Sequence, residues 1–330
     1  ALGALDALRP ETSVRVEAAT KLLKDPERDV RKAAFLALRR FKADARRLHP
    51  PAAMALVDYV DSQGDTDGIN FQDLTDALAE VAGADAVPVL VRLAKSGDDW
   101  GAHGLGRVGP GALPAAELLA SLMAGEKNRI LMREWAAEAF VKLGPLDAAT
   151  ADKVVPDLLV ALRAQGDGVE AGRIRGRALE GLLACAALPA TVEKTVSEMI
   201  PGLTGDERGP WRRDLVQLLA ERFPKSAAPF KETLLEVKET PRGAALLAEL
   251  DPETPGLVVW VMDRLKVDAE RIDVEGKSKC THNPTEMAWL LRAARAFKKA
   301  PPFQLATERA LWANDAATRD AARKTLAEMR

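Results

Sequence analysis

The sequence contains little of what usually identifies a protein's chemistry. It has two cysteines, three histidines and one tyrosine, and aromatic residues make up 5% of the chain. Cys185 sits in an apolar run and Cys280 in a polar one, so the pair does not suggest a disulfide framework, which favours a reducing compartment. No apolar run reaches the roughly 18 residues that a membrane span requires. A nucleophile elbow, a phosphate-binding loop and a zinc-protease motif are also absent from the sequence.

These absences lead us to expect a cytoplasmic protein that does not associate with membranes. The first residue, Ala1, fits a trimmed initiator methionine or a cleaved leader, so a secreted or periplasmic location stays open. The chain has 47 Lys and Arg against 49 Asp and Glu, and its isoelectric point is near 6.1. This balance argues against nucleic acid as the partner.

Helical periodicity, by contrast, is abundant, and residues 128–145 (NRILMREWAAEAFVKLGP) show it best. Ala136, Ala137, Phe140 and Leu143 recur at helical spacing and form one apolar stripe. A Gly-Pro pair then ends the predicted helix. Such a helix cannot bury its stripe alone, so we expect other helices of the chain to cover it.

Copies of this pattern recur along the chain. Each has an arginine, which follows an apolar residue or, in the last copy, Thr318; an alanine or leucine stands three positions after the arginine, and an apolar residue four positions beyond that. The arginines of these copies are Arg15, Arg31, Arg133, Arg175, Arg212 and Arg319. Successive arginines from Arg133 to Arg212 are separated by 42 and 37 positions, a period typical of two-helix repeats. Prolines such as Pro51, Pro88 and Pro156 are predicted near the start of each partner helix. Because the arginines recur at one place in each unit, we expect Arg133, Arg175 and Arg212 to be structural rather than catalytic.

The sequence therefore predicts an all-α fold, an α-solenoid of stacked antiparallel helix pairs that forms a single domain over residues 1–330. We expect an elongated monomer without strands outside residues 267–282. Residues 61–70 and 267–282 are polar and are predicted to be loop insertions, and residues 251–300 follow the repeat less regularly.

The segments DVRKAAFLAL, LGRVGPGALPAAELL and REWAAEAFVKLGP resemble HEAT repeats, particularly the bacterial HEAT-like repeats of phycobiliprotein lyases. The resemblance covers most of residues 11–250 and returns in the final helix. It implies stacked helix pairs in a curved superhelix whose concave face binds a partner. It implies little about chemistry, because repeats of this kind serve many functions.

Two groups of residues are candidate metal ligands. Asp61, Asp65, Asp67 and Asp73 surround a glycine in residues 61–73, as oxygen ligands do in a calcium loop, although the spacing is one residue short. The alternative is an acidic turn that caps the next helix. Cys280 and His282 could contribute to a zinc site, or simply precede a helix that begins at Asn283-Pro284. Calcium at residues 61–73 is thus the one cofactor that the sequence suggests.

Charge is distributed unevenly, and this gives the clearest hint of a binding surface. Residues 1–50 carry 12 Lys and Arg against 7 Asp and Glu, whereas residues 51–127 carry 4 against 12. The basic side chains gather at Arg39, Arg40, Arg46 and Arg47, and Trp100 follows a Gly-Asp-Asp turn where partial exposure is expected. These five residues are the predicted contacts for a protein or peptide partner, which the basic cluster suggests is acidic. The alternative is a solvated face whose opposite charges compensate one another.

Three functions fit these observations. The first is a non-enzymatic scaffold that binds a protein on the concave face of the solenoid. The second is an alkylpurine DNA glycosylase of HEAT-like architecture, which would need a basic groove lined by aromatic residues. The third is a bilin lyase, which only the repeat subtype suggests.

Overall fold

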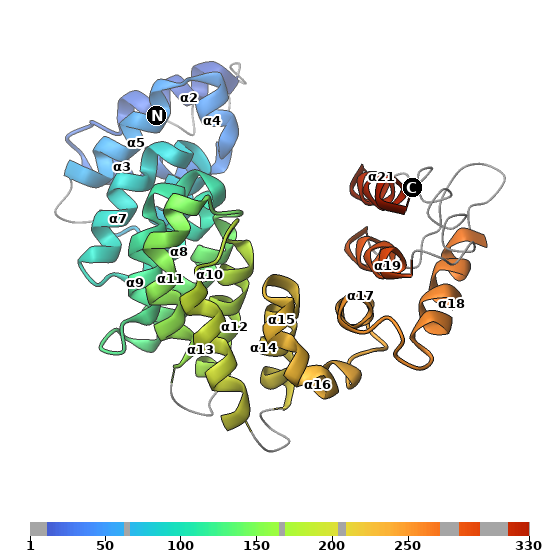
Figure 1. Cartoon of the computed structure of the whole chain (residues 1–330). Helices are drawn as coiled ribbons and strands as arrows, with labels where there is room; N and C mark the ends of the chain where they lie inside the picture. Colours follow the sequence, from blue (N-terminus) through green and yellow to red (C-terminus); the bar gives the residue numbers. More distant parts are fainter. Residues whose placement is uncertain are drawn as a thin grey trace. The chain divides into compact units, whose positions relative to one another are not determined.

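The computed structural model describes residues 12–62, 67–164, 169–203, 209–270, 284–297 and 316–329 (Figure 1). In this part of the chain, helices pack against helices that are near in sequence, and no β-strand occurs. The predicted all-α, solenoid-like fold is confirmed. The chain divides into two compact units, unit 1 over Ala1–Pro189 and unit 2 over Ala190–Arg330. Whether residues 1–330 behave as a single domain stays a prediction.

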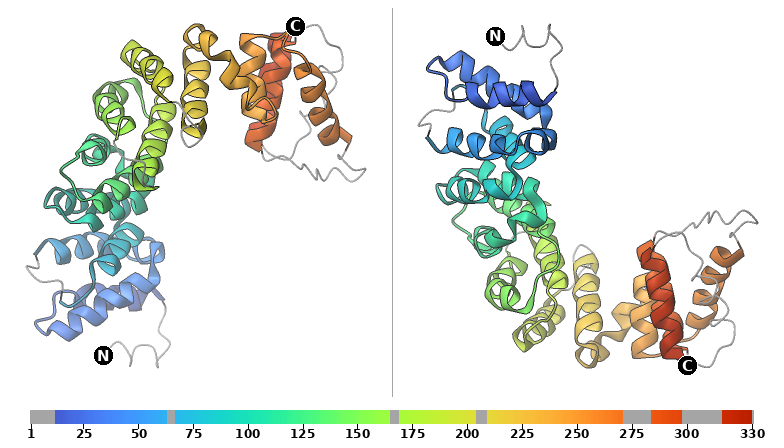
Figure 2. Two further views of the ribbon diagram at one scale, coloured as in Figure 1. Left: turned by 90° about the horizontal axis from the view of Figure 1, so that it is seen from below. Right: turned by 90° about the horizontal axis from the view of Figure 1, so that it is seen from above.

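Unit 1 is built from two layers of helices, which can be followed in Figure 2. Layer A contains α2 (Thr12–Leu22), α5 (Pro51–Ser62), α7 (Val87–Lys95), α9 (Ala116–Ala124) and α11 (Ala148–Leu162). Layer B contains α3 (Arg28–Phe41), α6 (Phe71–Ala77), α8 (Asp99–Val108), α10 (Ile130–Lys142) and α12 (Val169–Ala184). The connections include α4 (Ala43–Leu48), the π-helical turn η1 (Leu78–Ala82), and the 3-10 turns η2 (Gly83–Ala86) and η3 (Gly109–Ala115). Layer-B helices contact one another in chain order, α3 to α6 to α8 to α10 to α12.

Unit 2 repeats this arrangement of helices packed in chain order. Its elements are α13 (Ala190–Met199), η4 (Ile200–Gly202), α14 (Gly209–Arg222), α15 (Pro224–Ala227), η6 (Ala228–Phe230), α16 (Lys231–Leu235), α17 (Pro241–Leu250), α18 (Leu257–Glu270), α19 (Pro284–Ala296) and α21 (Ala316–Met329). The helices α14, α17, α19 and α21 contact one another in succession.

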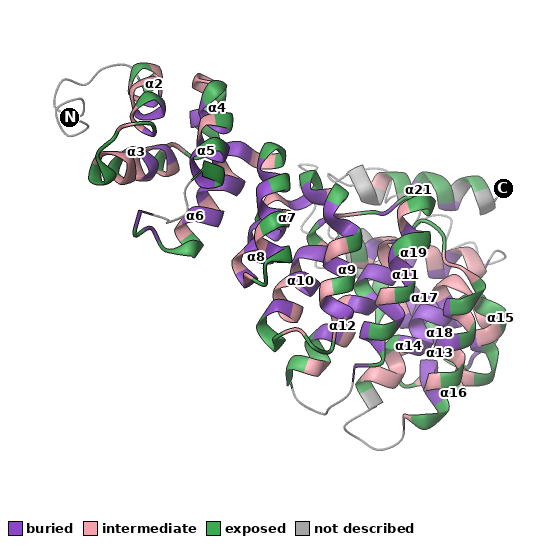
Figure 3. Cartoon of the chain, turned by 90° about the vertical axis from the view of Figure 1, so that its left-hand side faces the viewer, coloured by how far each residue is buried: buried purple, intermediate pink, exposed green. Residues whose placement is uncertain are grey.

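The apolar stripe predicted in α10 is buried. Ala136, Ala137, Phe140 and Leu143 are each at most 2% exposed, and α10 itself packs against α8, α9 and α12. Buried, intermediate and exposed residues alternate along the helices, as Figure 3 shows. Burial of these apolar side chains is the main favourable term in stacking one helix pair on the next.

Glycines bring α8 unusually close to its neighbours. A Cβ atom at Gly101 would lie 2.3 Å from the backbone nitrogen of Ala94 in α7, and one at Gly104 would lie 2.6 Å from a methyl carbon of Leu90. On the other side of α8, Gly106 approaches Ala139 of α10, where a Cβ would lie 3.0 Å from the Cα. The three glycines in DWGAHGLGRV therefore permit close helix packing on two sides.

Two of the recurrent arginines donate to carbonyl groups at the ends of preceding helices. Arg133 donates from Nε to the carbonyl oxygen of Met123 at 2.9 Å, and Arg175 donates from NH1 to that of Ala164 at 2.9 Å. Met123 lies in the last turn of α9, and Ala164 is the second residue after α11. Because carbonyl groups at a helix end lack partners within the helix, a cation there satisfies an acceptor and complements the helix dipole. These contacts support the structural role predicted for the arginines.

Three sequence predictions need correction. Pro156 lies inside α11, not near its start; its position is exposed, so the carbonyl freed by the missing N–H can meet water. The predicted loop at 267–282 begins as helix, because α18 continues to Glu270 through residues such as Ala269 and Glu270 that favour helix. The predicted loop at 61–70 likewise begins inside α5, which continues to Ser62. Residues 63–66 and 271–283, with Asp65, Cys280 and His282, lie outside the described residues.

Candidate functional site

The predicted basic cluster is largely engaged in ion pairs within the chain. Arg39 lies 2.7 Å from an oxygen of Asp73. Arg46 lies 3.1 Å from Asp85 and donates to the carbonyl oxygen of Ala82. Arg47 pairs with Asp44 on its own helix, and Arg40 is exposed. These are mostly pairs between successive repeats, so the basic first repeat and the acidic second one compensate each other. Contact of these arginines with an acidic partner stays a prediction.

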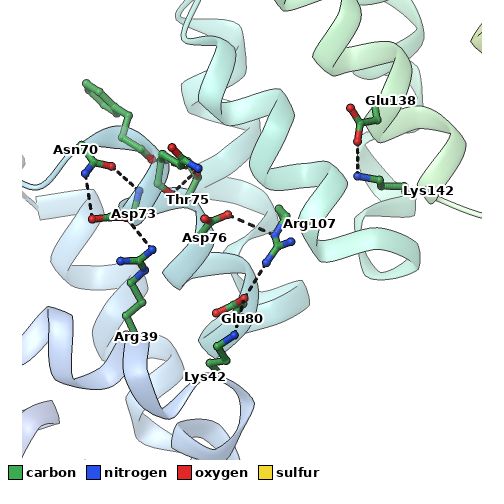
Figure 4. A network of polar contacts seen from close by, with 12 residues as sticks. Arg39, Lys42, Asn70, Asp73, Thr75, Asp76, Glu80, Arg107, Glu138 and Lys142 are labelled. Carbon is green, nitrogen blue, oxygen red and sulfur yellow. Dashed lines mark hydrogen bonds and ion pairs between the residues drawn. The ribbon is translucent and has the colours of Figure 1, made fainter.

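A second ion network continues along layer B (Figure 4). Glu80 in η1 accepts from Arg107 at 2.7 Å and lies 3.6 Å from the amine of Lys42. Arg107 also places its Nε 3.3 Å from Asp76. These contacts join the C-cap residue of α3, the end of α6 with the following turn η1, and α8, and they pair two acidic side chains with two basic ones.

The predicted calcium ligands are held by different cations. Asp61 pairs with Arg92 at 2.5 Å, and Asp73 pairs with Arg39 while its backbone N–H is capped by Asn70. Among the described residues, no group of three or more His, Cys, Asp or Glu side chains could hold a metal ion. The capping turn that the sequence offered as the alternative is therefore present, and a calcium site that also involves Asp65 stays a prediction.

Asp67 forms the most buried polar contact of this region. Its side chain is 4% exposed and accepts two hydrogen bonds from Arg31, at 2.7 and 2.8 Å, and one from the Tyr59 hydroxyl at 2.8 Å. The hydrogen bonds from Arg31 hold the pKa of Asp67 below its usual value, whereas burial raises the pKa of Tyr59. The contact links the first repeat to the loop of the second, which gives Asp67 a structural role.

An aromatic cluster lies where α8 meets α10. Trp100 and His103 of α8 and Trp135 of α10 are all half-buried, and the His103 ring meets the Trp135 ring edge-on at 4.5 Å between centroids. Trp100 lies 6.2 Å from Trp135 by the same measure. The Nδ1 atom of His103 is buried without a hydrogen-bond partner among the described residues, and burial lowers the pKa of His103. His103 is thus a neutral packing residue at neutral pH.

Trp135 continues from this cluster into a groove between α10 and α12. The groove has a volume of about 460 Å³, and Leu131 and Trp135 of α10 contribute its accessible apolar surface, whereas Ile174 of α12 is buried beneath it. Its charged lining comes from Glu134 and Glu138 of α10 and from Arg173 and Arg177 of α12. Leu131 is 45% exposed, a large fraction for a leucine in a packed repeat. We name this feature the α10–α12 groove.

Sequence reasoning assigned Trp135 to packing and did not find this groove. Trp100, which it did predict as a contact, is half-buried and reaches the groove only through its ring contact with Trp135. The signal was present in the spacing, because Glu134 and Glu138 are four residues apart and so are Arg173 and Arg177. What the sequence does not show is that α10 and α12 lie side by side.

Comparisons with known proteins support the fold and add no function. No protein-family model matches the chain, and no curated protein matches it either. A solved structure, the crystal structure of an engineered protein from the Northeast Structural Genomics Consortium, is similar over 99% of this chain and 90% of its own. The two share 18% sequence identity with a TM-score of 0.57, which shows the fold alone. The class of protein is therefore an all-α, solenoid-like helical array. None of the helices described is long and apolar enough to cross a membrane.

Proposed function

We propose that this chain is a non-enzymatic interaction scaffold of HEAT-like architecture that binds a protein segment on layer B of unit 1. The observation that carries the proposal is the α10–α12 groove, where Trp135 and an exposed leucine lie beside charged side chains. Protein-binding hot spots combine buried aromatic or aliphatic anchors with a polar rim, and Trp is among the residues most enriched in them.

The charges of unit 1 favour a protein partner over duplex DNA. Binding of DNA requires cations that are free to replace counterions along the phosphates. Arg39, Arg46 and Arg47 each have a carboxylate partner within the chain, and Asp76 of layer B and Glu80 of the turn η1 add negative charge beside them. A long polyanion along this layer would have to displace these pairs.

Site-specific photo-crosslinking tests the proposal. We replace Leu131 with p-benzoylphenylalanine and, as a matched control, Val160 of layer A, because the two side chains are 45% and 47% exposed. In extracts of the source cells we expect a discrete crosslinked protein from position 131 and none from position 160. Trp135→Ala should remove the crosslink while circular dichroism shows an unchanged fold.

Two outcomes would contradict the proposal. One is equal crosslinking from both positions, which would indicate nonspecific contact. The other is tight binding of duplex DNA at physiological salt, which would favour a glycosylase instead.

A further inference from the structure

The helix α2, the first described helix of unit 1, has apolar residues on two of its faces. Its buried residues, among them Val16 and Ala19, form one face. On another face Val14, Ala18 and Leu22 lie four residues apart and so form a stripe. Val14 is 48% exposed, and Ala18 and Leu22 are half-buried. We name these three residues the α2 stripe.

The α2 stripe lies at an end of the helical array where a polar surface is the rule. The helix α2 packs against α3, α4 and α5, all of which follow it in the chain. By comparison α5, the next helix of layer A, contacts both α2 and α7 (Figure 1) and buries six residues, whereas α2 buries three. The α2 stripe therefore resembles the surface by which an interior helix packs against the helix pair before it, and a further helix suits it best.

Charged side chains border the α2 stripe. Glu17 and Lys21 each precede a residue of the stripe by one position, and they form an ion pair within α2 at 2.7 Å. Their side chains are 47% and 74% exposed, so the pair contributes little to stability and its members can exchange partners at small cost. On the other border, the guanidinium group of Arg15 lies 5.3 Å from the ring centroid of Phe41, which holds this cation within its own helix pair.

The pattern of α2 is complementary to itself when two copies of the helix lie antiparallel about a two-fold axis near Ala18. Ala18 of one copy then lies beside Ala18 of the other, where the small side chains let the helices approach closely. Val14 lies opposite Leu22 of the second copy, and Glu17 lies opposite Lys21 of the second copy. Two-fold symmetry makes each of these contacts twice. Apolar ends and charges that match in this way favour a second copy of the chain as the occupant of the stripe.

We propose that the α2 stripe joins two copies of this chain in a two-fold dimer, with α2 packed antiparallel to α2 of the second copy. Glu17 pairs with Lys21 across the interface, as flanking charges do between coiled-coil helices. The interface is small, so we expect a dissociation constant of about 10–100 μM. The inference goes beyond the proposed function, because the dimer carries the α10–α12 groove twice and so gains avidity for a partner that displays its segment twice.

Sedimentation equilibrium of the full chain at about 1–300 μM tests the inference, because this range brackets the expected dissociation constant. Val14→Ser should raise the dissociation constant about tenfold, since it removes an apolar contact that the dimer makes twice. The matched control is Val160→Ser in layer A, where the side chain is 47% exposed against 48% for Val14. This control should leave the dissociation constant unchanged.

Charge reversal tests the antiparallel arrangement. E17K and K21E should each raise the dissociation constant about fivefold, because each replaces two attractive contacts by two repulsive ones. E17K/K21E exchanges the two charges and should restore the wild-type value. E138K changes a similar pair on α10, that of Glu138 and Lys142, and should have no effect. Circular dichroism and Tm confirm that each variant is folded.

Several results would overturn the inference. One is a chain that stays monomeric up to about 300 μM, as the sequence led us to expect. Another is a dimer that Val160→Ser or E138K weakens as much as the α2 variants do, and a third is a dimer that E17K/K21E fails to restore. The proposed function is tested separately, because a chain that dimerises but gives no crosslink from position 131 contradicts that function alone.

Discussion

Replacement of Asp67 by Asn should destabilise unit 1 far more than the same change at Asp61. Asp67 is 4% exposed and accepts hydrogen bonds from Arg31 and Tyr59, whereas Asp61 and its partner Arg92 are 58% and 56% exposed. Asn keeps the shape of the side chain and tolerates the left-handed backbone at position 67, where φ is 52°. The substitution therefore removes the charge without adding backbone strain.

The expected loss of stability in Asp67→Asn follows from the burial of the ion pair between Asp67 and Arg31. Removal of one partner from a buried ion pair costs roughly 3–5 kcal/mol. Arg31 is 18% exposed and keeps hydrogen bonds to two backbone carbonyl groups, so we expect the lower end, about 3 kcal/mol. For a unit of this size, that free energy corresponds to a fall in Tm of about 9 °C. Asp61→Asn should cost less than about 1 kcal/mol, because exposed pairs contribute little.

Urea titration and thermal melting, both followed by circular dichroism, measure the stability of the two variants. The pH dependence of that stability gives an independent check. Because the folded-state pKa of Asp67 is lowered, its contribution is present above the unfolded value of about 3.9 and is lost as pH falls through the folded pKa. The difference in unfolding free energy between wild type and Asp67→Asn should therefore become smaller below about pH 4. Equal effects of the two substitutions near neutral pH would refute the structural role of Asp67. An increase in wild-type Tm with calcium that both variants abolish would instead support the predicted calcium site.

Three further predictions concern packing and capping. Arg175→Ala should lower the free energy of unfolding by about 1–2 kcal/mol, because it leaves a helix-end carbonyl group without its hydrogen-bond donor. Arg173→Ala removes an exposed ion pair and should lower it by under about 1 kcal/mol. Equal urea midpoints for the two variants would contradict this prediction. Gly101→Ala should lower the free energy of unfolding by more than about 3 kcal/mol, because the added Cβ would overlap the backbone of α7. Gly176 has open space around it, so Gly176→Ala should be neutral or slightly stabilising. A Gly101→Ala protein as stable as wild type would disprove the close approach of α8 to α7. The folded-state pKa of His103 is lowered by burial, so the stability of the protein should fall as pH decreases through the unfolded-state pKa of about 6.5. In His103→Phe this part of the pH dependence of stability should disappear. If it persists in the variant, another group is responsible for it.

The local sequence was sufficient to predict that the chain is helical and which face of α10 is buried. The stripe from Ala136 to Leu143 follows from helical spacing, because burial of apolar area depends on which residues share a face. The recurrence of Arg133 and Arg175 likewise indicated a structural role before their carbonyl partners were known. These inferences succeeded because helix periodicity and helix-end capping act over a few residues.

The tertiary structure decided which charges meet, and with them the candidate site. The sequence grouped Asp61, Asp67 and Asp73 as one set of ligands, but the fold gives each a different arginine, at 31, 36 and 34 positions' distance along the chain. Glu134 and Arg173 are 39 residues apart and line one groove only because α10 and α12 pack together. Ion pairing depends on separations of a few ångströms, and the packing of successive repeats fixes those separations, which the spacing of residues within one helix cannot specify.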